Sequence, residues 1–362
     1  GGGDNVPGEV QFLSLSGVGD AATLSSEGSV TVGALPDSLA FNADGSKLVV
    51  ANEAQSIDIT DPVNNDAAGT ISVIDTSSYV AGDIRGFSVD TIDFTALNGQ
   101  EAQLNAEGIR INPNAGSVAQ DIEPEYVTVL GDRAWVSLQE NNAIAEIDLT
   151  DNSLTDIWSL GLKDWSAIAT DTSNRGEAGG AYGTKNLYGI KMPDGIDAFQ
   201  TGGGTYIITA NEGDDRDGDG DLNEAVRVGD LSEEFGASAE NQAYWQSQLG
   251  DRLKLSTTEG DTDTQPMASL DIGGPAEIGA YSPDHQVALA TTGGNELALI
   301  DLSDLSAPAL LGTFPLSRAL QSVAVSGDLV AVAVDGGGPA GFGFMAGARG
   351  AGHTHSFVAR LR

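Results

Sequence analysis

The chain has 362 residues, of which 16 are Lys or Arg and 53 are Asp or Glu, so its formal net charge at pH 7 is −37. Such a chain is not expected to bind nucleic acid or an anionic membrane, because both need clustered basic residues, and it favours cations as ligands. The absence of Cys excludes disulfides and thiolate sites, and no uncharged apolar run is long enough for a transmembrane segment.

Residues 1–8 begin with Gly1-Gly2-Gly3-Asp4 and are interpreted as an N-terminal tether. This segment resembles the one behind the lipidated Cys of a bacterial lipoprotein, and a cloning scar or a processing point is the alternative. Residues 9–15 then form an isolated strand pattern without a repeat around it.

Five segments repeat along the rest of the chain. Most start with a Pro or acidic turn and run into an alternating strand, a polar turn and a second strand. They cover residues 35–41, 123–129, 192–199, 275–281 and 320–325. In three of them a third strand ends in Asp, at 71–75, 144–148 and 297–301.

This recurrence predicts an all-β fold, a β-propeller with about five recognisable blades over residues 9–335. A β-sandwich is the alternative. Polar insertions near 79–120, 161–190 and 214–264 account for the longer spacings, and residues 238–249 in the last of them are the best helix candidate.

The sequence also predicts how the two ends of the propeller are arranged. The strand at 9–15 is expected to pair with the strand at 329–334, which closes the ring without an open edge. Residues 336–362 are rich in Gly and are interpreted as a C-terminal extension, mobile or used for attachment.

Acidic residues are expected to gather at one mouth of the central channel. The turn before the first strand and the loop after the second lie on the same face of a propeller. The first set is Asp37, Glu125, Asp194 and Glu277, and the second is Glu53, Glu140, Glu212 and Glu296. Unpaired carboxylates at this density repel one another, so Ca²⁺ is the predicted counterion. The alternative is that these residues only form solvated turns.

The sharpest motif lies in the third insertion. Asp215, Asp217 and Asp219 alternate and are followed by Gly220, as in the opening of a calcium loop. Asp221 and Glu224 are the candidates to complete the oxygen shell, because the twelfth position is not Glu. The segment 259–263 is a second, weaker candidate, and a solvated acidic loop is the alternative for both.

Catalytic motifs are scarce. The sequence has no nucleophile elbow and no phosphate-binding loop. His353 and His355 flank Thr354 in the tail and could bind a transition metal, although a disordered tail is the simpler interpretation. Calcium-dependent hydrolysis of phosphoesters needs only carboxylates and a bound water, so it stays open.

Several of these motifs resemble the choice-of-anchor I family of bacterial exported proteins, which is related to a mesenchyme-specific cell-surface glycoprotein. They are Val49-Val50-Ala51-Asn52-Glu53, Asp121-Ile122-Glu123-Pro124-Glu125-Tyr126, Gln139-Glu140-Asn141-Asn142 and Thr209-Ala210-Asn211-Glu212-Gly213-Asp214, with shorter matches at 32–37, 161–164 and 260–263. The resemblance implies a propeller-like domain, export and surface display, and it implies no activity. Residues 276–334 resemble the first blades of the family, which implies a circularly permuted order.

The leading hypothesis is therefore a calcium-binding protein of the cell surface or extracellular space, structural or adhesive and without enzymatic activity. Its expected partners are divalent cations and a matrix component, a surface polymer or further copies of itself. A calcium-dependent, phytase-like phosphoesterase acting at the acidic mouth is the alternative. A third interpretation is that the acidity reflects only a salty habitat.

Overall fold

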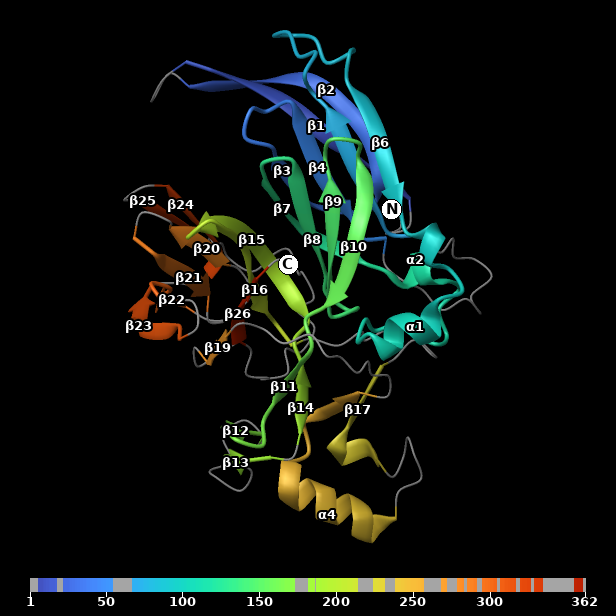
Figure 1. The fold of residues 1–362 in the computed structure, drawn as a ribbon, viewed down its shortest axis with the longest axis vertical. Helices are drawn as coiled ribbons and strands as arrows, with labels where there is room; N and C mark the ends of the chain where they lie inside the picture. Colours follow the sequence, from blue (N-terminus) through green and yellow to red (C-terminus); the bar gives the residue numbers. More distant parts are fainter. Residues whose placement is uncertain are drawn as a thin grey trace, which may run out of the picture.

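A computed structural model describes the chain in fifteen segments (Figure 1). They are residues 6–17, 22–54, 67–172, 182–185, 187–213, 224–231, 238–256, 268–271, 279–282, 285–291, 295–304, 307–316, 320–326, 329–334 and 355–360. Strands dominate these segments and helices are few and short, so the predicted all-β class is confirmed. No helix in the described part of the chain is long and apolar enough to cross a membrane.

The first two sheets are antiparallel meanders of four strands each. One contains β3 (Pro36–Phe41), β4 (Lys47–Asn52), β5 (Thr70–Asp75) and β6 (Ser88–Asp93), in chain order. The other contains β7 (Pro124–Leu130), β8 (Arg133–Leu138), β9 (Ala143–Asp148) and β10 (Ser153–Ser159). The repeats at 35–41 and 123–129 thus each open a four-stranded sheet, as the strand pattern predicts.

The next two sheets continue the series. The third has the order β15 (Pro193–Thr201), β16 (Gly204–Asn211), β26 (His355–Arg360), β19 (Ala268–Asp271). The fourth contains β20 (Gly279–Ser282), β21 (Val287–Thr291), β22 (Glu296–Asp301) and β23 (Ala309–Pro315). The last repeat forms the two-stranded sheet of β24 (Leu320–Ser326) and β25 (Leu329–Val334).

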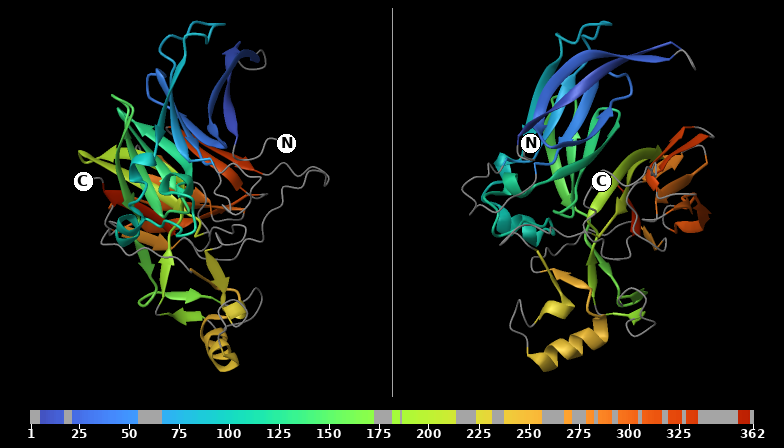
Figure 2. Two further views of the ribbon diagram at one scale, coloured as in Figure 1. Left: turned by 90° about the vertical axis from the view of Figure 1, so that its right-hand side faces the viewer. Right: turned by 180° about the vertical axis from the view of Figure 1, so that it is seen from behind.

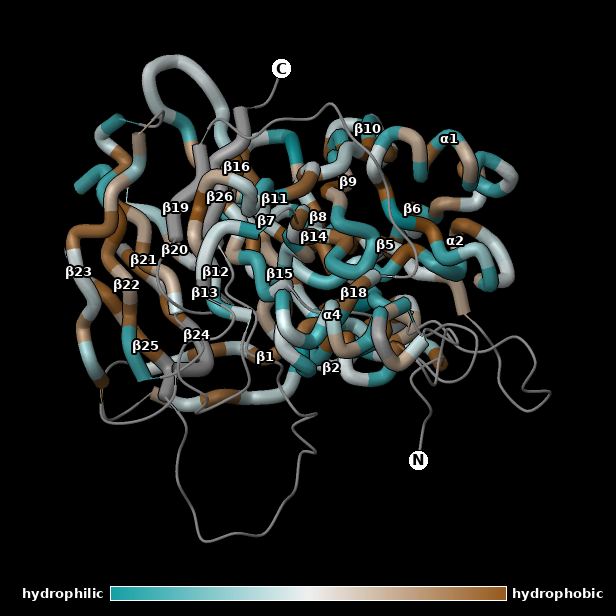
Figure 3. Tube along the Cα trace, turned by 90° about the horizontal axis from the view of Figure 1, so that it is seen from below, coloured by the Kyte–Doolittle hydropathy of each residue, from teal (hydrophilic) through white to brown (hydrophobic). Residues whose placement is uncertain are grey.

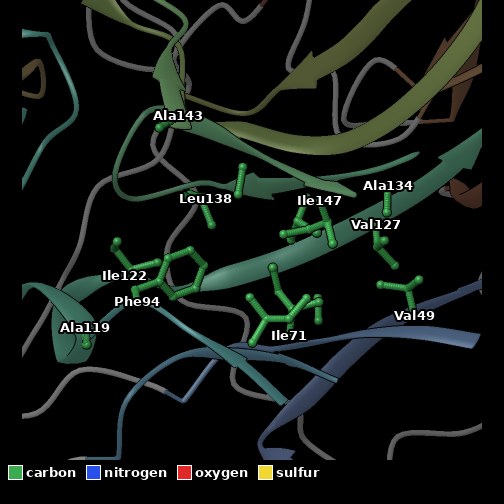
Figure 4. Packing of buried hydrophobic residues seen from close by; sticks show 14 of the residues in the cluster. Val49, Ile71, Phe94, Ala119, Ile122, Val127, Ala134, Leu138, Ala143 and Ile147 are labelled. Carbon is green, nitrogen blue, oxygen red and sulfur yellow. The ribbon is translucent and has the colours of Figure 1, made fainter. Parts of the chain in front are cut away.

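These sheets pack face to face in chain order. In β4, alternate residues face opposite ways: Val49 and Ala51 join the core shared with β7–β10, whereas Leu48 and Val50 join a second core on the other side. Figure 4 shows Val49 and Ile71 of one sheet meeting Val127, Ala134 and Ile147 of the next. Further cores join the β7–β10 sheet to the third sheet, the third to the fourth, and the fourth to β24–β25.

The first strands of successive sheets lie next to one another. Contacts join β3 to β7, β7 to β15, β15 to β20 and β20 to β24, and the sheets fan out around these strands in Figures 1 and 2. Hydrophobic residues concentrate in the strands, plainly so in β21–β23 in Figure 3. More than two sheets pack in series, so the fold is not a two-sheet sandwich.

The N-terminal strand differs from its prediction. β1 (Pro7–Ser16) pairs with β2 (Thr23–Ala34) in a long hairpin, and β25 pairs with β24, so the described strands show no pairing between 9–15 and 329–334. Closing a hairpin over a short turn costs far less chain entropy than pairing strands some 300 residues apart. The hairpin instead covers the outer face of the first sheet through Val10 and Val32.

The three insertions contain most of the remaining elements. The first includes β6, η2 (Thr95–Leu97), α1 (Glu101–Ala106) and α2 (Val118–Asp121). The second forms two small hairpins, β11 (Leu162–Asp164) with β14 (Tyr188–Ile190) and β12 (Ala169–Asp171) with β13 (Tyr182–Thr184). The third contains β17 (Ala225–Arg227), η4 (Val228–Asp230), α4 (Ala239–Leu249) and β18 (Lys254–Ser256).

The second and third insertions project together at the end of the molecule opposite the β1–β2 hairpin (Figure 1). The helix predicted at 238–249 is confirmed, with Ser238 as its N-cap accepting from the Asn241 amide. At the C-terminal end, residues 355–360 of the predicted extension form β26 inside the third sheet. Residues 336–354 lie outside the described segments.

Candidate functional site

The acidic residues after three prolines are positioned by irregularities in the strand pairing. Pro36 lies opposite Asn52, Pro124 opposite Leu138 and Pro193 opposite Asn211. In each pair the register shifts directly after the proline, so Asp37, Glu125 and Asp194 lie within the irregular stretch. A bulge at the end of a strand re-aims the side chain that it carries, which turns three acids out of the regular sheet at equivalent places.

The acids that follow the second strands are held by a matching set of backbone bonds. Glu53 donates its amide to the Leu35 carbonyl at 2.9 Å, and Glu212 donates to the Met192 carbonyl at 3.1 Å. Both acceptors have left-handed backbone, with φ of 47° at Leu35 and 50° at Met192. Such conformations are costly for residues other than Gly and persist where the surrounding structure enforces them. The same strained turn therefore fixes Glu53 and Glu212 in two sheets.

The asparagines beside these acids have a structural role. Asn52 is fully buried and donates to Ser72 Oγ at 3.0 Å and to the Thr70 carbonyl at 3.1 Å. Asn141, also fully buried, donates to the Arg110 carbonyl at 2.8 Å. These amides tie the ends of the second strands to neighbouring segments, a role that the sequence pattern did not separate from cation binding.

Glu125 lies among four other acidic residues of these two sets. Its pKa is raised well above the usual value, first by burial and then by the negative charges of Glu140, Asp194, Glu53 and Asp37. One oxygen, Oε2, is buried without a hydrogen-bond partner among the described atoms. Burial also raises the pKa of the neighbouring Tyr126, with further contributions from Asp194, Glu125, Asp37 and Glu212.

The structure thus brings together Glu53, Glu140 and Glu212 from the predicted metal set, with three acids of the first strands. We call these six residues the carboxylate cluster: Asp37, Glu53, Glu125, Glu140, Asp194 and Glu212. They come from three successive sheets. Within the described segments, no group of three Asp, Glu or His side chains is already arranged to hold a metal ion.

A buried ion pair lies beside the carboxylate cluster. Arg110 Nη2 is 2.6 Å from Glu224 Oε2, and the two side chains are 3% and 1% exposed. Asn112 donates to the other oxygen of Glu224 at 3.2 Å, and Arg110 also donates to the Glu140 carbonyl at 2.9 Å. Glu224, predicted as a calcium ligand, is therefore neutralised by a guanidinium that joins the first and third insertions.

The other predicted ligands of the loop, Asp215, Asp217, Asp219 and Asp221, lie outside the described segments, and so do Glu277, His353 and the segment 259–263. Their assignment to calcium stays a prediction. His285 is exposed in a turn of the fourth sheet.

Two basic side chains escaped the sequence analysis. Arg110 is one of only 16 Lys and Arg residues in the chain and follows the apolar Ile109. This sequence context indicates only weakly that the Arg110 side chain is buried. Lys191 is 3% exposed and donates to the Leu160 carbonyl. Burial, and then the charge of Lys163, lower the pKa of Lys191 to about 7. Lys163 Nζ lies 5.4 Å from the centre of the Trp165 ring, a cation–π distance.

Comparison with known proteins places the sequence in a family. The family model described as the choice-of-anchor I domain matches residues 2–274, which confirms the resemblance seen in the motifs. No curated protein matches the sequence significantly.

Solved structures with a similar chain path include the periplasmic gluconolactonase of Pseudomonas aeruginosa, with 12% identity and a TM-score of 0.39 over 87% of this chain and 73% of that one. A protein from Bacteroides uniformis, assigned as a 6-phosphogluconolactonase, has 11% identity and a TM-score of 0.42 over 88% and 72%. Similarity at this level has no bearing on the activity of the chain.

Proposed function

This chain belongs to the choice-of-anchor I domain family, and from that premise we propose that it is a calcium-binding, propeller-type protein without enzymatic activity. Family membership makes it a surface-associated protein. The carboxylate cluster is proposed to bind the cation, and the ordered domain is proposed to act in adhesion or assembly outside the cell.

The propeller proposal rests on the serial packing of the sheets. Each repeat opens a sheet whose first strand contacts the first strand of the next. In three of the four-stranded sheets the strands follow one another outwards in chain order, and in the third sheet β26 lies between β16 and β19. This is the arrangement of blades around a channel. Five such sheets are visible, and we propose them as five blades.

The calcium proposal rests on one observation, the raised pKa of Glu125 among four other carboxylates. Two unit charges about 4 Å apart repel by about 1 kcal/mol in water and by about 4 kcal/mol at a protein surface. A proton on Glu125 relieves this repulsion, and so does a divalent cation held between the acids. Ca²⁺ suits carboxylate oxygens in flexible arrangements of six to eight ligands, which small side-chain rotations can supply.

The test is thermal unfolding and calorimetric titration with Ca²⁺ at neutral pH, after treatment with a chelator. Wild type is expected to bind at millimolar Ca²⁺ or below and to gain stability, by about 2.7 kcal/mol once Ca²⁺ reaches 100 times its Kd. Glu125→Gln combined with Asp194→Asn is expected to lose most of that gain. The exposed acid of β10, Asp156→Asn, is the matched control and is expected to behave as wild type.

A second pair of variants separates the two predicted calcium sites. Asp217→Asn with Asp219→Asn removes the loop ligands but leaves the carboxylate cluster. If the Asp217–Asp219 double variant still binds Ca²⁺, the carboxylate cluster is supported as the site. If wild type and the Glu125–Asp194 double variant bind Ca²⁺ equally, the proposal is contradicted. Calcium-dependent release of phosphate from phytate would replace the non-enzymatic role with the phosphoesterase alternative.

A further inference from the structure

Helix α4 has its aromatic residues on the face that does not pack. Gln242, Gln246 and Leu249 recur at helical spacing and are half-buried or buried; Gln242 donates to the Gly229 carbonyl in η4. On the neighbouring face, Asn241, Tyr244, Trp245 and Gln248 recur at the i, i+3, i+4, i+7 spacing and are all exposed. A surface helix commonly packs its aromatic side chains inward, whereas in α4 both aromatic residues lie beside the packed face and are exposed.

Tyr244 and Trp245 form an exposed aromatic pair. Tyr244 is 57% exposed and Trp245 is 44% exposed, the latter in contrast to Trp135 at 2% and Trp165 at 8%. The Tyr244 and Trp245 ring centres are 5.3 Å apart, and the rings are inclined at 72°. The helix lies at the far end of the molecule (Figure 1). An exposed apolar surface of this kind is available for contact with a ligand.

The described side chains of α4 beside this aromatic pair are uncharged, and the nearby Lys185 is engaged through its Nζ, which donates to the Gln248 carbonyl at 2.8 Å. Asn241 and Gln248 flank the rings, and a carboxamide can both donate and accept hydrogen bonds. The sequence Ala239–Leu249 contains a single charged residue, Glu240, in a chain of which 19% is charged. A ligand for this face must therefore offer apolar surface for stacking and hydroxyl or amide groups for the carboxamides.

We propose that the exposed face of α4, formed by Asn241, Tyr244, Trp245 and Gln248, is a binding site for an uncharged polysaccharide. The C–H faces of a pyranose ring stack on Tyr and Trp, and its hydroxyls pair with the carboxamides. The net charge of −37 repels nucleic acid, anionic lipids and acidic polysaccharides at long range, and it leaves an uncharged polymer unaffected. A membrane-surface helix would carry Lys and Arg on its polar face, and α4 contains neither.

The test uses soluble cello-oligosaccharides and chito-oligosaccharides with the full chain, read by calorimetry and by Trp fluorescence. Wild type is expected to bind at least one series at millimolar concentration or below, with a change in fluorescence that Trp245→Phe removes. Tyr244→Ala and Trp245→Ala are each expected to weaken binding about tenfold or more, equivalent to about 1.4 kcal/mol. Trp245→Phe keeps a ring and is expected to retain part of the affinity.

Tyr79→Ala, an exposed Tyr far along the chain at 46% exposure, is the matched control and is expected to bind as wild type. Because the substituted side chains are exposed, unfolding temperatures are expected to stay unchanged. Binding is expected to persist in chelator, which separates this site from the calcium proposal. Absence of binding to both series at millimolar concentration, or equal binding by wild type and the Tyr244–Trp245 double alanine variant, overturns the inference. So does equally tight, Trp245-dependent binding of an acidic polysaccharide such as polygalacturonate.

Discussion

Arg110 shows what one buried charge does in an acidic chain. Arg110 belongs to the first insertion, and its guanidinium contacts the Glu140 carbonyl in the β8–β9 turn and the carboxylate of Glu224 in the third insertion. Both Arg110 and Glu224 are almost fully buried. Removing one partner of such a pair destabilises a protein mainly because the other charge is then buried without compensation. The two insertions are therefore joined by an interaction that fails when either partner is removed.

Arg110→Met is expected to lower the free energy of unfolding by about 3–5 kcal/mol, because Glu224 is left as an uncompensated buried charge. The double variant Arg110→Met with Glu224→Met is expected to recover much of this loss. Denaturant unfolding is the measurement. The exposed pair Arg85–Asp83, 2.7 Å apart, provides the control: Arg85→Ala is expected to cause no measurable change. A single Arg110 variant as stable as wild type would show that the pair does not hold the insertions.

The buried Lys191 predicts that the folding stability of the protein depends on pH above pH 7. Its folded pKa of about 7 lies below the ordinary lysine pKa of 10.5, so between these values the unfolded chain binds a proton that the folded chain does not. Stability should therefore rise with pH across this window, and the cost of the buried charge is fully present below pH 7. Each pKa unit corresponds to about 1.4 kcal/mol.

Lys191→Met is expected to remove this slope. The variant should gain most over wild type at pH 6 to 7, and the gain should shrink as pH approaches 10. Urea unfolding at several pH values tests this prediction. The decisive quantity is the slope of the free energy of unfolding against pH, because Lys191→Met also removes the hydrogen bond to the Leu160 carbonyl and so changes stability at every pH. Parallel pH profiles for the two proteins would show that the ammonium is not buried in the folded state.

The β1–β2 hairpin covers one face of the first sheet. Leu48, 1% exposed, packs beneath it with Val10, Val32 and Ile74. Leu48→Ala is expected to cost about 2–5 kcal/mol, because it removes buried methyl groups and leaves a cavity. Leu15→Ala, at 73% exposure on the same hairpin, should leave the melting temperature unchanged. Equal effects in calorimetry would mean that the hairpin does not cover this core.

Most strands could be predicted from the sequence because their signal is local. The strands at 47–52, 71–75 and 144–148 fall within β4, β5 and β9, since β-branched residues and turn residues mark each one. Strand partners could not be predicted in the same way. Pairing depends on register and loop closure between distant segments, which is why the partner of β1 and the place of β26 were missed.

The carboxylate cluster was predictable for a different reason. Its members occupy the same two positions of a repeat, and a repeated unit places equivalent positions on one face. Arg110, Lys191 and the role of Asn141 belong to no repeat. Their burial results from how the insertions pack onto the sheets, and no periodic pattern in the sequence reports that packing.

For the whole molecule, the net charge of −37 opposes compactness through self-repulsion. The Debye length falls from about 10 Å at 0.1 M salt to about 3 Å at 1 M, so NaCl is expected to raise the melting temperature. Calcium at the carboxylate cluster should act at far lower concentration and be reversed by chelator. Stabilisation by molar NaCl alone, with no effect of chelator, would favour adaptation to a salty habitat over a specific cation site.

The place of β26 sets an order of events during synthesis. Strand β26 lies between β16 and β19, although both are translated earlier. About 140 residues separate β16 from β26, and ribosomes add roughly 5–20 residues per second. For roughly seven to thirty seconds, β16 has been made while the strand that will fill its open edge has not. In a nascent chain of this protein, this edge therefore stays open to pairing with another chain until β26 is made.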